Sequence, residues 1–104
     1  MQLKSLRMFE AVCDSGNFGA AAQQLHTVQS NITAHIKKLE DEVGAQLLVR
    51  ANPVFPTPAG HTLRRHAQHM LKSHDEALAQ LQSHHTGLTQ VRGALRLGSM
   101  ETTA

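Results

Sequence analysis

A helical stripe of four apolar residues constrains the fold of this chain more than any other feature. The four are Ile32, Ile36, Leu39 and Val43. Their steps of four, three and four place them on one side of a helix, facing a core. The stretch before them, Asn17 to Leu25, holds three consecutive alanines, which let a second helix cross closely, and Leu25 adds an apolar contact at its end. With a turn around residues 26–28, the sequence predicts a helix-turn-helix.

The face of the second helix opposite this stripe is polar. It carries short polar groups near the helix start and a lysine further along, as expected if the helix N-terminus enters a major groove and the lysine reaches phosphate. We predict base contacts from Gln29, Ser30 and Thr33. The DNA-binding residues that we predict on this helix are Gln29, Ser30, Asn31, Thr33, Ala34, Lys37 and Lys38. Alanine-rich helix pairs also occur in bundles that never meet nucleic acid, so the local pattern leaves that alternative open.

A further helix is expected at the start of the chain. Its apolar residues keep a helical period to about residue 15 and are Leu3, Leu6, Phe9, Val12 and Cys13. Gly16 suits a C-terminal cap, and Asn17 offers a side-chain oxygen to cap the next helix. The backbone N–H groups of Asn17 and Phe18 are expected to point outward, available to a DNA phosphate, while the Phe18 ring packs into the core. We interpret Cys13 as a structural thiol, because no base accompanies it locally.

One long helix is predicted in the second half of the chain. Thr57 supplies its cap and Pro58 its first position, and the helix is expected to continue to about Thr86 before Gly87 and Gly93 break it. Its apolar and histidine positions alternate in steps of four and three, as in a coiled coil. This seam comprises Ala67, Leu71, His74, Leu78, Leu81, His85 and Leu88. A small domain cannot cover so long a stripe, so the sequence implies a partner helix.

Length and charge limit the class of protein. The 104 residues allow one small domain with an appendage. No stretch approaches the roughly twenty apolar residues of a membrane span, and the N-terminus is unlike a signal peptide, so we expect a cytoplasmic protein. The net charge of +2 is modest for a DNA-binding protein. The arrangement of the charges along the helix is more informative than their sum. Lys37 and Lys38 precede the acidic run Glu40 to Glu42, which we interpret as a solvated face.

The eight histidines raise the possibility of a metal site. His66 and His69 are three residues apart, but His61 and His74 fall elsewhere around the long helix, and no acidic or cysteine ligand joins them at a recurring spacing. We therefore predict no metal site. The alternative is an interface with titratable positions, in which His74 and His85 lie on the seam.

Three segments that cover most of the chain resemble, in order and spacing, the N-terminal part of LysR-type transcriptional regulators. They are MQLKSLRMFEAVCDSGNFGAAAQQLH, QSNITAHIKKLEDEVGAQLLVR and TPAGHTLRRHAQHML. The specific matches are Phe9, Gly16, Phe18, Ala21, Ala22, Leu25, Gln29, Ile36, Leu39, Glu40, Gly44, Leu47, Arg50, Thr57, Ala59 and Gly60. The resemblance implies a mainly α fold: a winged helix-turn-helix with a three-helix core and a short two-stranded wing, followed by a long dimerising linker helix.

The same resemblance implies a function. It indicates a bacterial, sequence-specific DNA-binding transcriptional regulator that binds a promoter dyad as a homodimer and is not an enzyme. Its double-stranded DNA would be contacted by Asn17, Phe18 and Arg50 in addition to the second helix. The linker helix would pair with the same helix of a second subunit, and a tetramer is possible for the full-length protein.

The wing is expected directly after Gly44, where the helical period is lost and three prolines follow. The resemblance implies that Leu47 and Leu48 anchor the wing and that Arg50 is positioned for the DNA backbone or the minor groove. Relatives usually carry basic residues at the wing tip, whereas residues 52–55 here are uncharged. The contribution of the wing to minor-groove binding is therefore in question.

The recognition helix also departs from the pattern of the family. Val28 stands where relatives commonly carry a Ser or Thr cap, a role that Thr27 is expected to take over, and Ser30 replaces a proline. Ala34 and His35 stand where longer polar or basic side chains are common. Base reading at position 34 would then be limited to apolar contact, for instance with a thymine methyl group, while Gln29 keeps an amide that can bond adenine.

We divide the chain into a winged helix-turn-helix domain at 1–58, with the helix-turn-helix motif at about 18–37, and a linker and dimerisation helix at 59–88. Residues 89–104, with a strand expected at 94–98, would begin a truncated effector-binding domain and be disordered. We expect no cofactor in this fragment, and a small-molecule effector is implied for the missing domain. Two alternatives are a helix-turn-helix whose outward face binds a protein and a small metalloenzyme built from the histidines.

Overall fold

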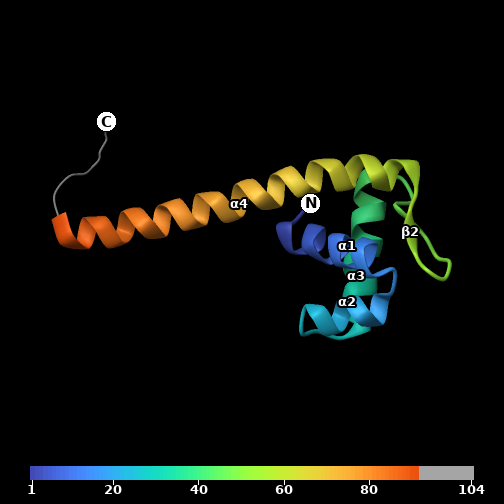
Figure 1. The fold of residues 1–104 in the computed structure, drawn as a ribbon. Helices are drawn as coiled ribbons and strands as arrows, with labels where there is room; N and C mark the ends of the chain where they lie inside the picture. The colour runs from blue at the N-terminus through green and yellow to red at the C-terminus, as the bar shows by residue number, and fades with distance from the viewer. Residues whose placement is uncertain (92–104) are drawn as a thin grey trace. The chain divides into compact units, whose positions relative to one another are not determined.

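The computed structural model describes residues 1–91, with side chains through residue 84 (Figure 1). Its elements in chain order are α1 Leu3–Ser15, α2 Phe18–Gln24, α3 Gln29–Val43, β1 Leu48–Val49, β2 Phe55–Pro56 and α4 Pro58–Val91. The chain divides into one unit at Met1–Leu71 and a second that begins at Lys72. The three-helix core, the two-stranded wing and the long helix that were predicted are all present. The strand expected at 94–98 lies outside the described residues.

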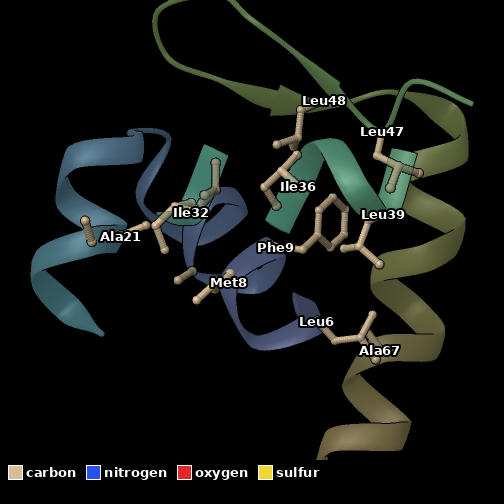
Figure 2. Packing of buried hydrophobic residues seen from close by; sticks show 13 residues of the cluster. Leu6, Met8, Phe9, Ala21, Ile32, Ile36, Leu39, Leu47, Leu48 and Ala67 are labelled. Carbon is tan, nitrogen blue, oxygen red and sulfur yellow. The ribbon is translucent and has the colours of Figure 1, made fainter. Parts of the chain in front are cut away.

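The core of the first unit forms where α1, α2 and α3 pack against one another and the start of α4 closes one side. In Figure 2 the ring of Phe9 points toward Ile36 and Leu39 of α3, and Leu6 points toward Ala67 of α4. The buried apolar residues are Leu6, Met8, Phe9, Ala11, Val12, Ala21, Ala22, Ile32, Ile36, Leu39, Leu47, Leu48 and Ala67. The predicted stripes of α1 and α3 therefore form one continuous core.

Three predicted positions differ from the sequence expectation. Val43 is 44% exposed and Leu3 is 36% exposed, because each lies in a terminal turn of its helix, beyond the residues that cover the middle. Ala67, which we assigned to the dimer seam, is fully buried in the core of its own unit. Its small side chain lets α4 approach α1 closely, and this position is removed from the predicted interface.

The ends of the first two helices follow the capping residues closely. Gly16 has φ +70°, a left-handed conformation that glycine adopts without steric cost, and its N–H donates to the carbonyl of Val12 at 2.7 Å. The side chain of Asn17 accepts from the N–H of Ala20 at 2.9 Å, as predicted for an N-cap. These two caps set the sharp turn that brings α2 across α3.

The start of α3 is not capped as we predicted. Val28 is the residue before the helix, and no side chain bonds to the first-turn N–H groups. Thr27 instead accepts from the side-chain amide of Asn31 at 3.0 Å, so its oxygen is occupied elsewhere. His26 takes the left-handed conformation in the turn, with φ +56°. The open N-terminus of α3 leaves its orphan N–H groups for other acceptors.

The wing and the start of α4 are joined tightly. The two strands pair antiparallel, with Leu48 opposite Pro56. Thr57 caps α4 by accepting from the N–H of Gly60 at 3.0 Å, as predicted. A Cβ on Gly60 would lie 2.0 Å from the carbonyl oxygen of Leu47, so only glycine fits where the helix crosses the wing.

Helix α4 is longer than the sequence indicated. It continues through Gly87 to Val91, and so includes residues 89–91, which we assigned to the tail. A single glycine inside a long helix costs about 1 kcal/mol relative to alanine, which the bonds of the neighbouring turns can offset. Through residue 91, no helix has the length and hydropathy that crossing a membrane requires.

Candidate nucleic-acid interface

The outward side of α3 presents a polar surface, which we call the recognition face and define as Gln29, Ser30, Thr33, Ala34 and Lys37. All five are exposed, whereas Ile32, Ile36 and Leu39 on the opposite side are buried. Within the described residues, the side chains of Gln29, Ser30 and Lys37 have no hydrogen-bonding partner, so their donors and acceptors are available to a ligand. Thr33 donates its hydroxyl to the carbonyl of Gln29 at 3.1 Å and keeps its lone pairs for a donor.

The other residues predicted on α3 have different surroundings. Lys38 is exposed beside the recognition face, and Ala34 offers only a methyl group. Asn31 is half-buried, and one N–H of its amide donates to Thr27, which leaves its second N–H and its carbonyl oxygen for other contacts. Asn31 therefore helps to fix the turn before α3, a role that the sequence did not indicate.

The acidic run at the end of α3 is only partly a solvated face. Glu42 forms an ion pair with the N-terminal ammonium of Met1. Glu40 turns toward the wing, where one carboxylate oxygen accepts from the N–H of Leu47 at 2.8 Å and of Leu48 at 3.3 Å. The interpretation of Glu40 as a solvated residue was therefore wrong. Helical periodicity carries no signal for such a bond, because the N–H donors lie outside the helix, at the start of the wing.

Arg50 is held within the domain rather than extended from the wing. Its guanidinium donates to the second carboxylate oxygen of Glu40 at 3.2 Å and lies 5.0 Å from the centre of the Phe18 ring. Such contacts fix the plane of the guanidinium. Its side chain remains 43% exposed, so donors are still open to an external acceptor. Arg50 thus joins the wing, the end of α3 and the start of α2.

The wing tip folds back on the turn between α1 and α2. The N–H of Val54 donates to the carbonyl of Gly16 at 2.9 Å, and a Cβ on Gly16 would lie 2.9 Å from the Cβ of Pro53. The predicted anchors Leu47 and Leu48 are buried. The wing is therefore fixed at its base and at its tip.

At the start of α2 the two predicted backbone donors differ. The N–H of Asn17 lies 3.3 Å from the hydroxyl oxygen of Ser15, so the expectation of a free N–H at this position was wrong. The side chain of Ser15 can reach back because Gly16 turns the chain sharply. Phe18 is half-buried against the core, as expected. A phosphate contact from the N–H of Phe18 stays a prediction.

The remaining seam positions lie on α4. Leu71 is half-buried against the core of the first unit, while Leu78 is 48% exposed and Leu81 is 65% exposed. His74 is exposed and pairs with Asp75 at 3.2 Å. The side chains of His85 and Leu88 lie outside the described residues. Two large apolar side chains of the second unit are thus left in contact with solvent.

The joint between α1 and α4 contains charged and thiol groups. Arg64 of α4 donates to Glu10 at 3.1 Å and forms a second ion pair with Asp14. Burial raises the pKa of Glu10, although Arg64 opposes this shift, and burial raises the pKa of the half-buried Cys13 to about 11. A thiol with so high a pKa is a poor nucleophile at neutral pH, consistent with a structural role. Among the described residues, no three His, Cys, Asp or Glu side chains form a group that could hold a metal ion.

Known proteins resemble this chain in sequence. Residues 3–61 match the family described as bacterial regulatory helix-turn-helix protein, lysR family. The chain is 39% identical over 105 residues to the HTH-type transcriptional regulator YofA of Bacillus velezensis, a match that covers 100% of this chain and 35% of that protein. The chain thus spans about a third of the length of the curated relatives that it matches.

Solved structures share the fold. The BenM DNA-binding domain in complex with benA site 1 DNA is 35% identical, with a TM-score of 0.79, over 84% of this chain and 99% of that chain. The full-length LysR-type regulator LysG from Corynebacterium glutamicum, with bound effector Arg, is 31% identical, with a TM-score of 0.75, over 81% of this chain and 29% of that one.

Proposed function

The chain belongs to the lysR family of bacterial regulatory helix-turn-helix proteins, and we propose that it regulates transcription in the cytoplasm by binding a promoter dyad as a homodimer. The observation that carries this proposal is the recognition face. Three of its side chains are exposed and without partners among the described residues, on the helix side opposite the buried Ile32, Ile36 and Leu39. A surface helix whose core side is fixed and whose outer polar groups are unused is suited to reading base edges.

The roles of the residues follow from their positions. Gln29 has a free amide that can donate to N7 of adenine and accept from its N6 amine in a bidentate contact, while Ser30 and Thr33 offer single bonds. Lys37 lies two helical turns after Gln29 and is suited to a phosphate. The similar BenM domain was solved in complex with DNA, which supports DNA as the ligand of this domain.

The assembly of the whole protein is also a proposal. The exposed Leu78 and Leu81 support pairing of α4 with α4 of a second copy, since large apolar side chains at helical spacing favour burial. No reaction is assigned to this chain, because the proposed activity needs only binding. A small-molecule effector would act through a further domain, as the LysG structure with bound Arg supports.

Selection of bound duplexes from random DNA, followed by gel-shift titration, tests the proposal. We expect a recovered site with two related half-sites, bound at least about a thousandfold more tightly than random DNA of the same length. A helix-turn-helix that docks a protein would recover no consensus. Lys37→Ala serves as the companion variant and should weaken binding to all sequences alike, lowering the salt slope by about one.

A further inference from the structure

Two adjoining hollows lie along one side of α3, between the recognition face and α1. The larger, about 280 Å³, lies beside the turn before α3 and is lined by Lys4, Arg7, His26 and Asn31 among others. The smaller, about 170 Å³, is lined by Asn31, Ala34, His35 and Lys38. Asn31 lines both hollows, and we call the two together the α1-side track.

The charge of this track is of one sign. Lys4, Arg7 and Lys38 are cations, and His26 and His35 add imidazoles, while none of the described residues that line either hollow is acidic. Asp41 and Glu42 line a third hollow further along α3, which shares Lys38 with the smaller hollow and marks the end of the track. A concave surface lined by one sign of charge attracts an anion with several charges along its length.

Two histidines that line the track are held in place by their surroundings. The hydroxyl of the buried Ser5 lies 2.9 Å from Nδ1 of His35. In the tautomer in which this hydroxyl donates to Nδ1, the proton of the neutral ring is on Nε2, which is then a donor. His26 is held in the left-handed conformation, an uncommon one for a residue other than glycine, so the turn fixes its position.

The dimensions of a major groove indicate that the ligand of this track is the sugar-phosphate backbone of DNA. The groove is about 12 Å wide and an α-helix with its side chains is about 10–12 Å across, so a helix in the groove has a sugar-phosphate backbone along each flank. Phe18 and Arg50 lie toward one flank of α3, that of α2 and the wing. The α1-side track lies along the other flank.

We propose that the α1-side track binds successive phosphates of the DNA strand that borders the major groove on the side of α1, with Lys4, Arg7, His26 and His35 as contacts additional to Lys38. This inference rests on the proposed function, because it requires α3 to enter the groove. It makes the interface two-sided: one backbone is held by the wing and α2, the other by α1 and the turn.

The test combines charge removal on the protein with charge removal on single phosphates. Lys4→Gln and the double variant Lys4→Gln/Arg7→Gln are titrated against the selected site and random DNA, with Lys72→Gln, an exposed lysine outside the track, as the control. We expect the salt slope to fall by about one and about two, with equal loss on both DNAs, and to stay unchanged in the control. Thermal unfolding confirms that each variant folds.

Single phosphates are then replaced by uncharged methylphosphonates along both strands. For the parent, replacements on both borders of the groove should weaken binding. For the double variant, replacement of the phosphates that Lys4 and Arg7 contact should cause no further loss, because the partner charges are already absent, while every other sensitive phosphate on either border keeps its full effect.

The possible results separate this inference from the function on which it rests. A parent that shows no site-selective binding overturns both. If the parent reads its site but the double variant keeps the parental salt slope, or is as sensitive as the parent to every phosphate replacement, only the α1-side track is wrong. A third result would also overturn the inference: if the double variant binds DNA more weakly with an unchanged salt slope, and its melting temperature is lowered, Lys4 and Arg7 have a structural role.

Discussion

Helix α3 and the part of α4 that follows Leu71 both carry apolar side chains at helical spacing. Only those of α3 are covered by residues of the same chain. On α3, Ile32 and Ile36 are fully buried. On α4 beyond Leu71, Leu78 and Leu81 remain exposed. The same periodicity therefore has two meanings. In the first unit it builds a domain that is complete by itself, and in the second it marks a surface that a partner helix would cover.

The largest expected effect is a loss of folding stability when a buried residue of α3 is shortened. Ile36→Ala removes buried methyl and methylene groups from the core and should lower the free energy of unfolding by about 2–5 kcal/mol. Val43→Ala, on the same stripe of the same helix but 44% exposed, is the matched control and should cost less than about 1 kcal/mol. Urea unfolding measures both. Equal losses would mean that Val43 is covered in solution.

The exposed stripe is tested by charge. Leu78→Asp/Leu81→Asp would place carboxylates in the seam, where burial of ionised groups costs several kcal/mol, so the dimer should dissociate while the first unit stays folded. Affinity for a full dyad should then fall toward the non-specific range of about 10⁻⁴–10⁻⁶ M. Gln80→Asp, exposed on another side of α4, is the control. Sedimentation measures whether the variant is a dimer, and titration with full and half sites measures its affinity for DNA. A monomer that bound the full site with parental affinity would contradict the proposal that the protein reads its site as a dimer.

A smaller effect is expected where α3 holds the wing. Glu40→Gln keeps an oxygen for the N–H groups of Leu47 and Leu48 but removes the charge that pairs with Arg50. Because Arg50 is partly exposed, we expect a loss of stability of about 0.2–1 kcal/mol from the ion pair. Arg50→Ala should lose a similar stability and, in addition, lower the salt slope of DNA binding by about one. An unchanged slope in Arg50→Ala would show that Arg50 serves the wing alone.

The smallest expected effect is a difference in the rate of thiol alkylation between the interior of the first unit and the surface of the second. Burial raises the pKa of Cys13 to about 11, so very little thiolate is present at pH 8 and alkylation of the native protein should be slow. A cysteine at position 80 in a Cys13→Ala background is exposed and should react at close to the rate of a free thiol. Mass spectrometry over time compares the two, and equal rates would mean that α1 opens readily from α4.

The sequence predicted the elements well because their signals are local. The stripe of α3, the caps at Gly16 and Asn17, and the start of α4 at Pro58 all depend on neighbours within a few residues. Ala67 was misassigned because a coiled-coil spacing and a core contact share the same period, and only the path of the chain decides between them.

The candidate site was predictable to a lesser extent. The recognition face follows directly from the stripe on the other side of its helix. The bond from Glu40 to the wing, the position of Arg50 over Phe18 and the α1-side track join residues that are distant in sequence. Such contacts depend on how irregular segments fold against helices, and the helical periodicity of the sequence does not predict them.

Selection of bound sequences from random DNA by the parent and by Gln29→Ala tests most directly whether the recognition face reads bases. The parent should recover a consensus with two related half-sites. Gln29→Ala should recover the same consensus with preference lost at one base pair per half-site, at a cost of about 1–3 kcal/mol for that pair. An identical consensus from both proteins, with the same preference at every position, would contradict the assignment of this face to DNA.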